Sequence, residues 1–453
     1  MKEDVITGSI AYHGHKFTEV GKIKLLKTIN YFNSIKFGIN NSLLNYLNSE
    51  GKFLLNDMDE EELSNSKISL RMAELYKEIP FYITTHADWR GRIYTNCFYL
   101  SYQGSEMATA LLQFWNGLTL TTEGLNNLCN YGATLYSDQL SKENYDSKRL
   151  WLVDNKINIL KMEPEFIKKA DSPLLSAAFC LETKKLEQDK NDKIYLPVFI
   201  DATCSGIQHL SAMVLDSELA TLVNLTPKAG DNDKPEDIYN TLVEPINKAI
   251  NEFGAKNTEF AALKNLYLDR KILKRPIMTQ NYNVSIFGMK EQLFDSLSVE
   301  QDILVVDKLE DIKKVKSKNV IIGRNKEGDE IILTNKDLFR VAMIIKEVIF
   351  LQYPVLKDIY DYFIDTAKLM ECLKLPVQWL TPTGAVITQE YKKSSKKRIR
   401  VLINKKSQTK ILRIWNNEID HKKQKDGIIP NVIHSLDSSH IINLILDKPE
   451  SFE

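Results

Sequence analysis

The sequence predicts a helix-rich α+β protein. Several long segments space their apolar residues three and four apart, as helices do, and a few shorter segments have the apolar or alternating pattern of strands. The expected helical segments are residues 20–78, 104–182, 235–300 and 336–374. The expected strand segments, 194–200, 320–333 and 377–412, lie far apart along the chain, which favours α+β over a regular βαβ alternation. The length of 453 residues allows roughly two to four packed units.

The helical segments carry clear local signals. Leu25, Ile29, Phe32 and Ile35 lie on one face of the first segment, and the residues 49–51 predict a break within it. A proline at position 235 is typical of the start of a helix.

The strand segments differ in character. The run Ile194–Ile200 is apolar and β-rich, which predicts a buried strand, although Pro197 fits there only at an edge or a bulge. Residues 320–333 predict a hairpin that turns at 325–328. Residues 377–412 alternate apolar and basic side chains, which predicts one long hairpin.

Composition excludes some classes of protein. No apolar run reaches the roughly 18–20 residues of a membrane span, and the acidic start shows neither a secretory signal nor a transit peptide. The five cysteines form no C-x-x-C pair, which argues against a zinc site and a disulfide framework and favours a reducing compartment.

Charge is balanced overall but not locally. With 60 basic and 60 acidic residues, net charge gives no argument for nucleic-acid binding. Residues 392–413, however, contain many lysines and arginines and no acid, so this block could hold phosphates. The alternative is a solvated, charged hairpin.

Asp201 is the first candidate catalytic residue. It follows the apolar run, and small residues come next at Ala202, Thr203, Ser205 and Gly206. This layout suits Mg²⁺-dependent phosphoryl transfer, because a rigid strand aims a hard oxygen ligand while small neighbours let the backbone and the substrate approach. The alternative is that Asp201 caps a helix that starts near Ser205.

A second group of candidates lies in residues 268–282. Arg270, Lys274, Met278 and Tyr282 recur every four residues, so on a helix they form one stripe. The two cations suit the phosphates of a nucleoside triphosphate, and the thioether and phenol suit its sugar and base. The alternative is a basic surface helix whose Met278 and Tyr282 pack inward.

Both groups resemble the signature motifs of the single-subunit RNA polymerases of phages and mitochondria. The first is similar across residues 197–208 and the second across residues 268–282. The likeness extends from about residue 65 to the C-terminus, through the segments Asp88–Arg92, Asp171–Pro173, Phe179–Glu182, Asp237–Tyr239, Gly427–Asn431 and His434–His440. The residues around Phe81–Tyr82 and Gly91–Tyr94 are similar to polymerases carried on fungal and plant mitochondrial plasmids.

The resemblance implies a role for each matching residue. Asp201, with the carbonyl of Ala202, would bind catalytic Mg²⁺, and Lys274 would be the catalytic lysine on the nucleotide phosphates. The other implied substrate-binding residues are Arg270, Tyr239, Tyr282 and His434, of which the last two would sense the ribose 2′-hydroxyl. The implied nucleic-acid-binding residues are Arg90 and Arg92, on the template or hybrid backbone, and Lys396, Lys397, Arg398 and Arg400, in a hairpin that reads promoter DNA.

The resemblance also implies an architecture and a set of partners. The fold would be a right-handed polymerase with palm, fingers and partial thumb. The expected domains are a helical thumb-like region at 1–80, a first half of the palm at 81–230, fingers at 231–350, and a specificity-like hairpin with the second half of the palm at 351–453. The partners would be a DNA template, an RNA product and ribonucleoside triphosphates, in a mitochondrion or, alternatively, in a phage-infected cytoplasm.

The family's second catalytic aspartate has no match in this sequence. In the family it lies in a His-Asp element soon after the segment that resembles Pro449–Phe452, and the sequence given stops at Glu453. Two-metal chemistry needs carboxylates that bridge both ions. We therefore expect residues 1–453 alone to bind nucleic acid in a salt-dependent way but not to polymerise nucleotides. The expected function is DNA-directed RNA synthesis, and the alternatives are an inactive relic that only binds nucleic acid or, more weakly, a DNA polymerase.

Overall fold

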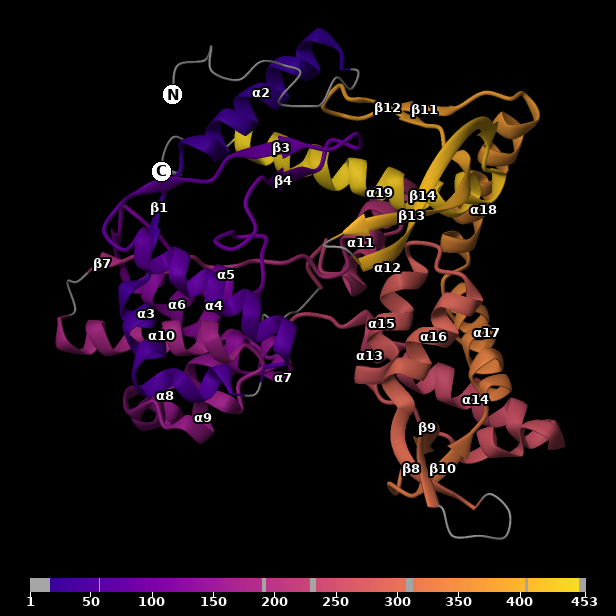
Figure 1. Ribbon diagram of the computed structural model, residues 1–453, viewed down its shortest axis with the longest axis horizontal. Helices are drawn as coiled ribbons and strands as arrows, with labels where there is room; N and C mark the ends of the chain where they lie inside the picture. The colour runs from indigo at the N-terminus through magenta and orange to yellow at the C-terminus, as the bar shows by residue number, and fades with distance from the viewer. Residues whose placement is uncertain are drawn as a thin grey trace.

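The computed structural model describes residues 17–56, 58–189, 193–228, 234–306, 313–403 and 406–447. These residues form an N-terminal lobe, a C-terminal lobe and a layer that lies across both (Figure 1). Helices make up most of each lobe, and each sheet among the described residues has two or three strands. The prediction of a helix-rich α+β protein is therefore confirmed. Part of the expected thumb-like region, residues 1–16, and the segment Pro449–Phe452 lie outside the described residues.

The N-terminal lobe surrounds one apolar core, in which Leu43, Leu44, Ile159 and Ala177 are fully buried. Its helices are α3 (Asn41–Asn48), η2 (Glu50–Leu55), α4 (Glu60–Leu75), α5 (Glu106–Ala110), α6 (Thr122–Tyr136), α7 (Asp138–Ser141), α8 (Tyr145–Lys161), α9 (Pro164–Lys168) and α10 (Pro173–Gln188). Its strands are β1 (Lys36–Ile39), β2 (Phe81–Tyr82) and β5 (Leu112–Phe114) in one sheet, and β6 (Leu118–Thr119) with β7 (Lys193–Ile194) in another. The predicted break at 49–51 is confirmed, because α3 ends at Asn48.

The C-terminal lobe has its own, larger core. Its helices are α11 (Ser205–Val214), α12 (Ser217–Leu222), α13 (Ile238–Thr241), α14 (Val243–Lys256), η3 (Thr258–Asn265), α15 (Arg270–Gln280), α16 (Ile286–Leu297), α17 (Asn335–Gln352) and α18 (Pro354–Cys372). Its sheet has the order β10 (Glu330–Leu333), β9 (Lys313–Arg324), β8 (Ser298–Val306). The predicted hairpin at 320–333 is confirmed, and Gly328 supplies the positive φ of 96° that its turn requires. Strand β8 was not predicted.

The joining layer contains α2 (Glu19–Ser34), the pair β3 (Thr85–Ala87) and β4 (Ile93–Thr95), the pair β11 (Val377–Leu380) and β12 (Val386–Gln389), and the long helix α19 (His421–Leu446). Helix α19 runs across the top of the molecule toward α2 (Figure 1). Its residues Ile428, Ile429, Val432 and Ile433 belong to the core of the C-terminal lobe. Ile442 packs instead with Leu25, Ile29 and Ala87 of the joining layer. One helix therefore holds parts of the chain that are distant in sequence.

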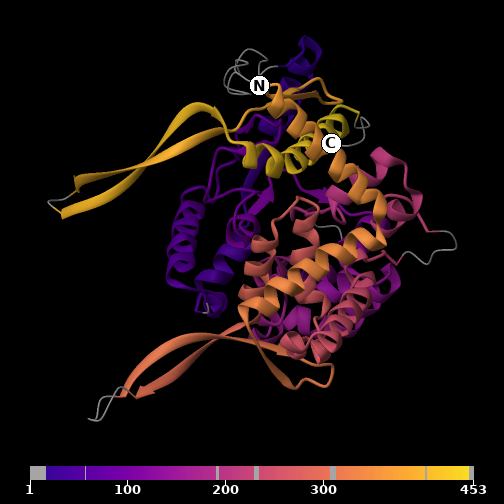
Figure 2. The ribbon, with the colours of Figure 1, turned by 90° about the vertical axis from the view of Figure 1, so that its right-hand side faces the viewer.

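Two long hairpins project from the same side of the body, β8–β9 and the pair β13 (Lys392–Ile403) and β14 (Lys406–Ile419) (Figure 2). The prediction of one long hairpin over 377–412 is wrong, because two hairpins follow each other there. Gly384, at φ 87°, closes the first one after only four residues per strand, and the amide of Ala385 donates to the hydroxyl of Thr381 across that turn.

The predicted buried strand at 194–200 is also wrong. Only its first residue, Ile194, belongs to a strand, and Val198, Phe199 and Ile200 are 50 %, 37 % and 92 % exposed. No strand among the described residues pairs with them, and Pro197 has no amide hydrogen to offer a neighbouring strand. Asp201 consequently does not stand at the end of a strand.

Among the described residues, no helix combines the length and the apolar character that a membrane span requires.

The contact between α6 and α10 makes a stability prediction. A methyl group added at Gly132 would overlap the ring of Phe179, which is 2 % exposed. We expect Gly132→Ala to lower the free energy of unfolding by about 1–3 kcal/mol, the usual effect of overpacking a core.

The matched control is Gly124→Ala, near the start of the same helix, where the nearest atom is the end of a leucine side chain at 3.2 Å. This change should be neutral or slightly stabilising, because alanine favours helices over glycine. Urea unfolding of both variants tests the prediction, and equal effects would contradict it.

Candidate functional site

Asp201 lies in an exposed connection between the two lobes. Its Oδ1 accepts a hydrogen bond of 2.9 Å from the amide of Ala202. Helix α11 begins just after it, near Ser205 as predicted, but Cys204 is its N-cap residue, so Asp201 does not cap the helix either. The described residues contain no group of three or more His, Cys, Asp and Glu side chains that could hold a metal ion. Asp201 is therefore not part of such a group.

The two cations predicted on one stripe do lie together on α15. Asp269 caps this helix by accepting from the amide of Ile272, and Pro276 is accommodated within it. The Nε atom of Arg270 donates to Asp237 over 2.6 Å, and its Nη1 donates to Asp138 over 2.7 Å. Lys274 reaches the other oxygen of Asp138 at 3.4 Å. Arg270, Lys274, Asp138 and Asp237 are called the cation cluster below.

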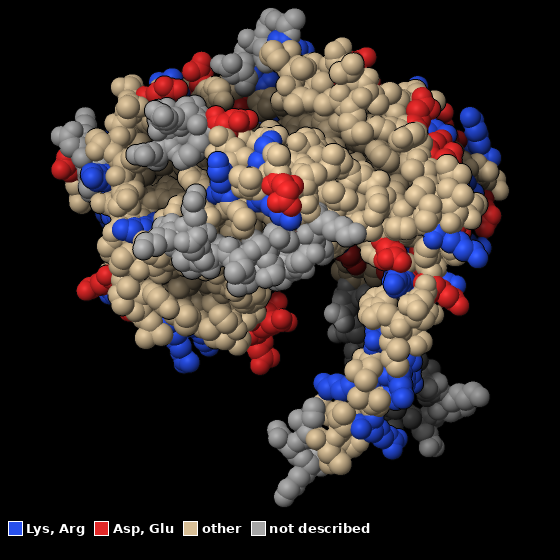
Figure 3. Space-filling model, turned by 90° about the horizontal axis from the view of Figure 1, so that it is seen from above, with Lys and Arg blue, Asp and Glu red and all other residues tan. Residues whose placement is uncertain are grey.

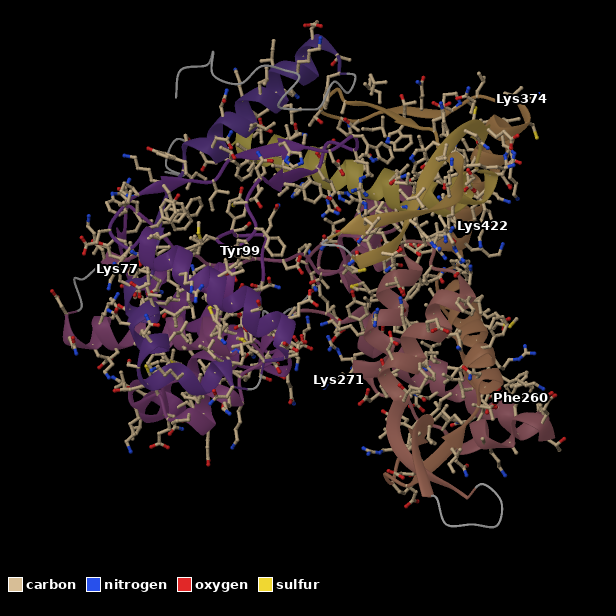
Figure 4. The ribbon with its side chains drawn as sticks, in the orientation of Figure 1. Lys77, Tyr99, Phe260, Lys271, Lys374 and Lys422 are labelled. Atoms are coloured by element: carbon tan, nitrogen blue, oxygen red, sulfur yellow. The ribbon has the colours of Figure 1, made fainter. Side chains whose placement is uncertain are left out.

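The cation cluster crosses from one lobe to the other. Asp138 begins α7 of the N-terminal lobe, whereas α15 belongs to the C-terminal lobe, and Lys271 of α15 lies at the edge nearest the N-terminal lobe (Figure 4). Burial raises the pKa of the Asp138 carboxyl, but the charges of Lys274 and Arg270 outweigh it and hold that pKa below its usual value. Asp138 is therefore ionised at neutral pH and balances both cations.

The ring of Tyr239 packs against the guanidinium of Arg270. The guanidinium carbon of Arg270 lies 5.8 Å from the centre of the Tyr239 ring, a cation–π distance. Tyr239 is 6 % exposed, and burial together with the neighbouring Cys204 raises the pKa of its hydroxyl, to which Cys204 is hydrogen bonded. The Nη2 atom of Arg270 is buried and has no hydrogen-bond partner among the described residues.

Cys204 links this cluster to a second one. Its backbone is left-handed, with φ 58°, and its sulfur accepts a hydrogen bond of 3.1 Å from the side chain of Asn281. The next residue, Tyr282, lies beyond α15, which ends at Gln280, so the predicted stripe is wrong for its last member. A turn bond from the amide of Tyr282 to Thr279 brings the phenol back toward the start of α11, where Ser205 is hydrogen bonded to it.

Tyr282 faces His434 of α19. Their ring centres are 5.4 Å apart. The Nδ1 atom of His434 lies 2.7 Å from Nη1 of Arg90, and Arg90 in turn donates to Asp88. Tyr282, His434, Arg90 and Asp88 are called the ring cluster below.

The charge on His434 is suppressed. Burial, followed by the charges of Arg92 and Arg90, lowers the pKa of its imidazole to about 4. Burial raises the pKa of the Asp437 carboxyl, but the hydrogen bond and charge of His209 outweigh it, with a smaller contribution from Arg92, so that this pKa is lowered. The Nε2 atom of His209 lies 3.0 Å from Asp437. Of the two arginines predicted to lie on nucleic acid, Arg90 is part of the ring cluster and Arg92 lies near it, and contact with a template stays a prediction.

The predicted basic hairpin forms a separate surface. Lys396, Lys397, Arg398 and Arg400 are all exposed on β13. Lys396 stands directly opposite Arg413 of β14, an arrangement of like charges that is unfavourable without an anion nearby. Figure 3 shows lysine and arginine atoms gathered along this projecting arm.

The structure thus brings many of the predicted residues into two clusters. Asp201 with Ala202, and the four predicted cations of β13, belong to neither cluster. Arg270, Lys274 and Tyr239 meet in one cluster, and Tyr282, His434 and Arg90 meet in or beside the other. Sequence reasoning missed the acidic partners. Asp88, Asp237 and Asp437 lie within the resembling segments, which was a usable signal, but no motif indicated Asp138.

Comparison with known proteins decides the family. The profile of the DNA-dependent RNA polymerase family matches residues 119–450, well over half of the chain. The chain belongs to this family. It is 38 % identical to a probable DNA-directed RNA polymerase of Gelasinospora sp., over 99 % of this chain and 53 % of that protein. It is 35 % identical to a probable DNA-directed RNA polymerase of Neurospora crassa, over 83 % of this chain and 41 % of that protein.

The likeness reaches organelle enzymes. The chain is 26 % identical to the mitochondrial DNA-directed RNA polymerase of Mus musculus, over 84 % of this chain and 30 % of that protein. The resemblance to phage-type single-subunit RNA polymerases is confirmed. The chain spans about half the length of the Gelasinospora relative and less of the other two.

In this member of the RNA polymerase family, the cation cluster makes a testable contribution to stability. Arg270→Gln removes the cation that pairs with Asp237 and leaves Asp138 with Lys274 alone, and the side chain of Asp237 is only 15 % exposed. We expect the free energy of unfolding to fall by about 1.5–3 kcal/mol, the usual worth of hydrogen bonds to charged groups. The control, Arg275→Gln on the same helix, removes an exposed pair with Asp295 at 3.4 Å and should cost less than about 1 kcal/mol.

The effect of Arg270→Gln should depend on pH. Because the pKa of Asp138 is lowered in the folded protein, its ion pairs stabilise above the unfolded value of about 4, and this stabilisation is lost as pH falls through the folded pKa. The gap between wild type and variant should therefore narrow below about pH 4. Urea unfolding between neutral and acid pH measures it, and a constant gap would contradict the assignment.

Proposed function

We propose that the protein is a DNA-directed RNA polymerase, a nucleotidyltransferase that adds ribonucleotides to an RNA 3′ end opposite a DNA template. The observation that carries the proposal is the junction of the cation cluster and the ring cluster at Cys204. Two cations able to bind phosphates are linked, through Tyr239, Cys204 and Asn281, to a phenol and an imidazole able to bind a sugar, in a chain of this family.

The cation cluster supports a role in phosphate binding. Catalysis of phosphoryl transfer consists mostly of positioning and of neutralising charge on the phosphates. Arg270 would bind in its fixed position over Tyr239, and Lys274 would follow the phosphates as a mobile point charge. Asp138 forms ion pairs with both cations in this structure, so an incoming triphosphate would displace its carboxylate from them.

Asp201 and Ala202 fit the ligands that Mg²⁺ prefers. Magnesium takes hard oxygen donors, and the exposed carboxylate of Asp201 with the carbonyl of Ala202 could supply two of them. Bound there, Mg²⁺ would act as a Lewis acid on a phosphoryl oxygen.

The ring cluster supports a choice of ribonucleotides. A site that hydrogen-bonds a substrate hydroxyl rejects an analogue that lacks it, because its own polar groups are then left without partners. Tyr282 and His434 would serve the 2′-hydroxyl in this way.

The remaining proposals concern architecture and surroundings. The right-hand division into palm, fingers and partial thumb follows the boundaries given above. The exposed lysines and arginines of β13, with those near the ring cluster, would bind phosphates of DNA and RNA. Mitochondrial relatives favour a mitochondrial location. An inactive relic is not favoured, since Asp201, Arg270, Lys274, Tyr282 and His434 are all retained.

Lys274→Ala tests the proposal directly. In the complete protein, on a primed DNA template with Mg²⁺ and ribonucleotides, we expect the rate of nucleotide addition to fall about 10²–10³-fold, because contacts to developing charge strengthen in the transition state. Template affinity should change little. Arg275→Ala, one residue further along α15 with an exposed partner, is the control and should keep the wild-type rate. Equal losses of rate and template affinity would make Lys274 merely structural.

Tyr282→Phe tests the choice of sugar. Loss of the phenol should let deoxynucleotides in more readily, so the ratio of kcat/KM for ribo- over deoxynucleotides should fall at least about tenfold. Tyr353→Phe removes a phenol that is bonded to Thr241 elsewhere in the same lobe and should leave the ratio unchanged. An unaltered ratio in Tyr282→Phe would remove Tyr282 from this role.

A further inference from the structure

The contact between Arg90 and His434 bears on which ring nitrogen of His434 carries the proton. They lie 344 residues apart in sequence, and 2.7 Å separates Nη1 of Arg90 from Nδ1 of His434. A guanidinium is always protonated and can only donate. The Nδ1 atom of His434 must therefore accept, which leaves the single proton of the neutral ring on Nε2.

We propose that Arg90 is a positioning residue that fixes His434 in the Nε2–H form, so that His434 donates a hydrogen bond to the sugar and selects for an acceptor at its 2′ position. The proposal rests on the proposed function, and it adds the direction of the hydrogen bond and the residue that sets it.

Arg90 has little freedom to release His434. Its Nε and Nη2 atoms donate to one oxygen of Asp88 over 2.9 and 2.6 Å, and Nη2 also reaches the hydroxyl of Tyr94 at 3.2 Å. The other oxygen of Asp88 accepts from the amides of Arg90 and Arg92, so the carboxylate is itself held by the β3–β4 turn. The side chains of Arg90 and Asp88 are 20 % and 18 % exposed.

The helix that carries His434 is also bonded directly to the turn that carries Arg90. Ser438, one turn after His434 on α19, donates to the carbonyl of Gly91 in the same turn. A side chain added at Gly91 would meet the hydroxyl of Ser438, and the backbone there has φ 86°. The close approach that only glycine permits thus sets the distance between the turn that carries Arg90 and the helix that carries His434.

Burial and the two nearby arginines keep the imidazole neutral. The β3–β4 turn presents Asp88, Arg90 and Arg92, and α19 itself presents Asp437, which is bonded to His209 of α11, while Tyr282 follows α15. Burial and the two arginines lower the pKa of His434 to about 4, against the opposing carboxylates. Protonation would also place a hydrogen on Nδ1, directly against the guanidinium. His434 therefore stays a neutral donor throughout the range near neutrality.

The direction of this hydrogen bond has a chemical consequence. A donor at Nε2 rewards an oxygen acceptor at the sugar and gives nothing to a 2′-hydrogen. The hydroxyl's own proton is left for another acceptor, so His434 and Tyr282 need not compete for the same lone pair. A mobile proton, shared between the two ring nitrogens, would lose part of this discrimination.

The first test measures the tautomer itself and needs no activity. Residues 1–453 with ¹⁵N-labelled histidine give ring-nitrogen signals from seven histidines, and the His434→Gln variant identifies those of His434. We expect a neutral ring with the proton on Nε2 between about pH 6 and 8. Arg90→Lys keeps the charge but loses the planar fork that Asp88 holds, so the ring should exchange between tautomers or take up a proton at higher pH. Arg275→Lys is the control and should leave His434 unchanged. A protonated ring, or a proton on Nδ1, in the wild type would overturn the proposal whatever the variants do.

The second test measures selection in the complete polymerase. We expect Arg90→Lys to lower the ratio of kcat/KM for ribo- over deoxynucleotides by about tenfold, near the worth of one hydrogen bond, and to make this ratio depend on pH between about 5 and 8. The wild-type ratio should be flat there.

The two tests separate the two proposals. An Nε2–H ring in a wild type that makes no RNA on any primed template would refute the proposed function and leave the tautomer in place. RNA synthesis with an unchanged, pH-independent ratio in Arg90→Lys would refute the role of Arg90 and leave the proposed function in place.

Discussion

The packing of α19 is the constraint on which the candidate site depends. This helix supplies His434 and Asp437, yet its own position is fixed by buried polar contacts with distant segments. The side chain of Asn431 donates to Gln389 and Tyr391, and the Trp379 ring nitrogen donates to Ser435. Buried polar groups need hydrogen-bond partners, so these bonds allow α19 few alternative positions. The apolar residues of α19 are buried in the core, and the polar contacts select the register of the helix.

In both clusters, each arginine is paired with acidic side chains. Arg90 forms an ion pair with Asp88, and Arg270 forms ion pairs with Asp237 and Asp138. Partly buried cations need such partners, because an unpaired buried charge is costly. This explains why overall composition, with equal numbers of acidic and basic residues, concealed the sites. The β13 hairpin differs, since its cations stand exposed and solvent screens them.

The sequence predicted the helices, and it pointed to several residues of the two clusters, because both depend on local pattern. Apolar spacing indicated the long helices, and the motifs identified Arg270, Tyr282 and His434. Contacts between distant residues escaped prediction: Asp138 and Arg270 are 132 residues apart, and no periodicity reports such a pair. The strand predicted at 194–200 failed for a related reason. An apolar run records the capacity to be buried, whereas a strand also requires a partner, and the pattern says nothing of that.

Asp138 gives the cation cluster a property that a free anion could not. Because the carboxylate is attached to the folded chain, it competes for the cations without ever diffusing away. A ligand with one negative charge gains little by replacing it, since one carboxylate is merely exchanged for another anion. A ligand with several charges gains from Arg270 and Lys274 together. We therefore expect Asp138 to act as a tethered counterion that makes the number of charges on the ligand, rather than charge alone, the condition for entry.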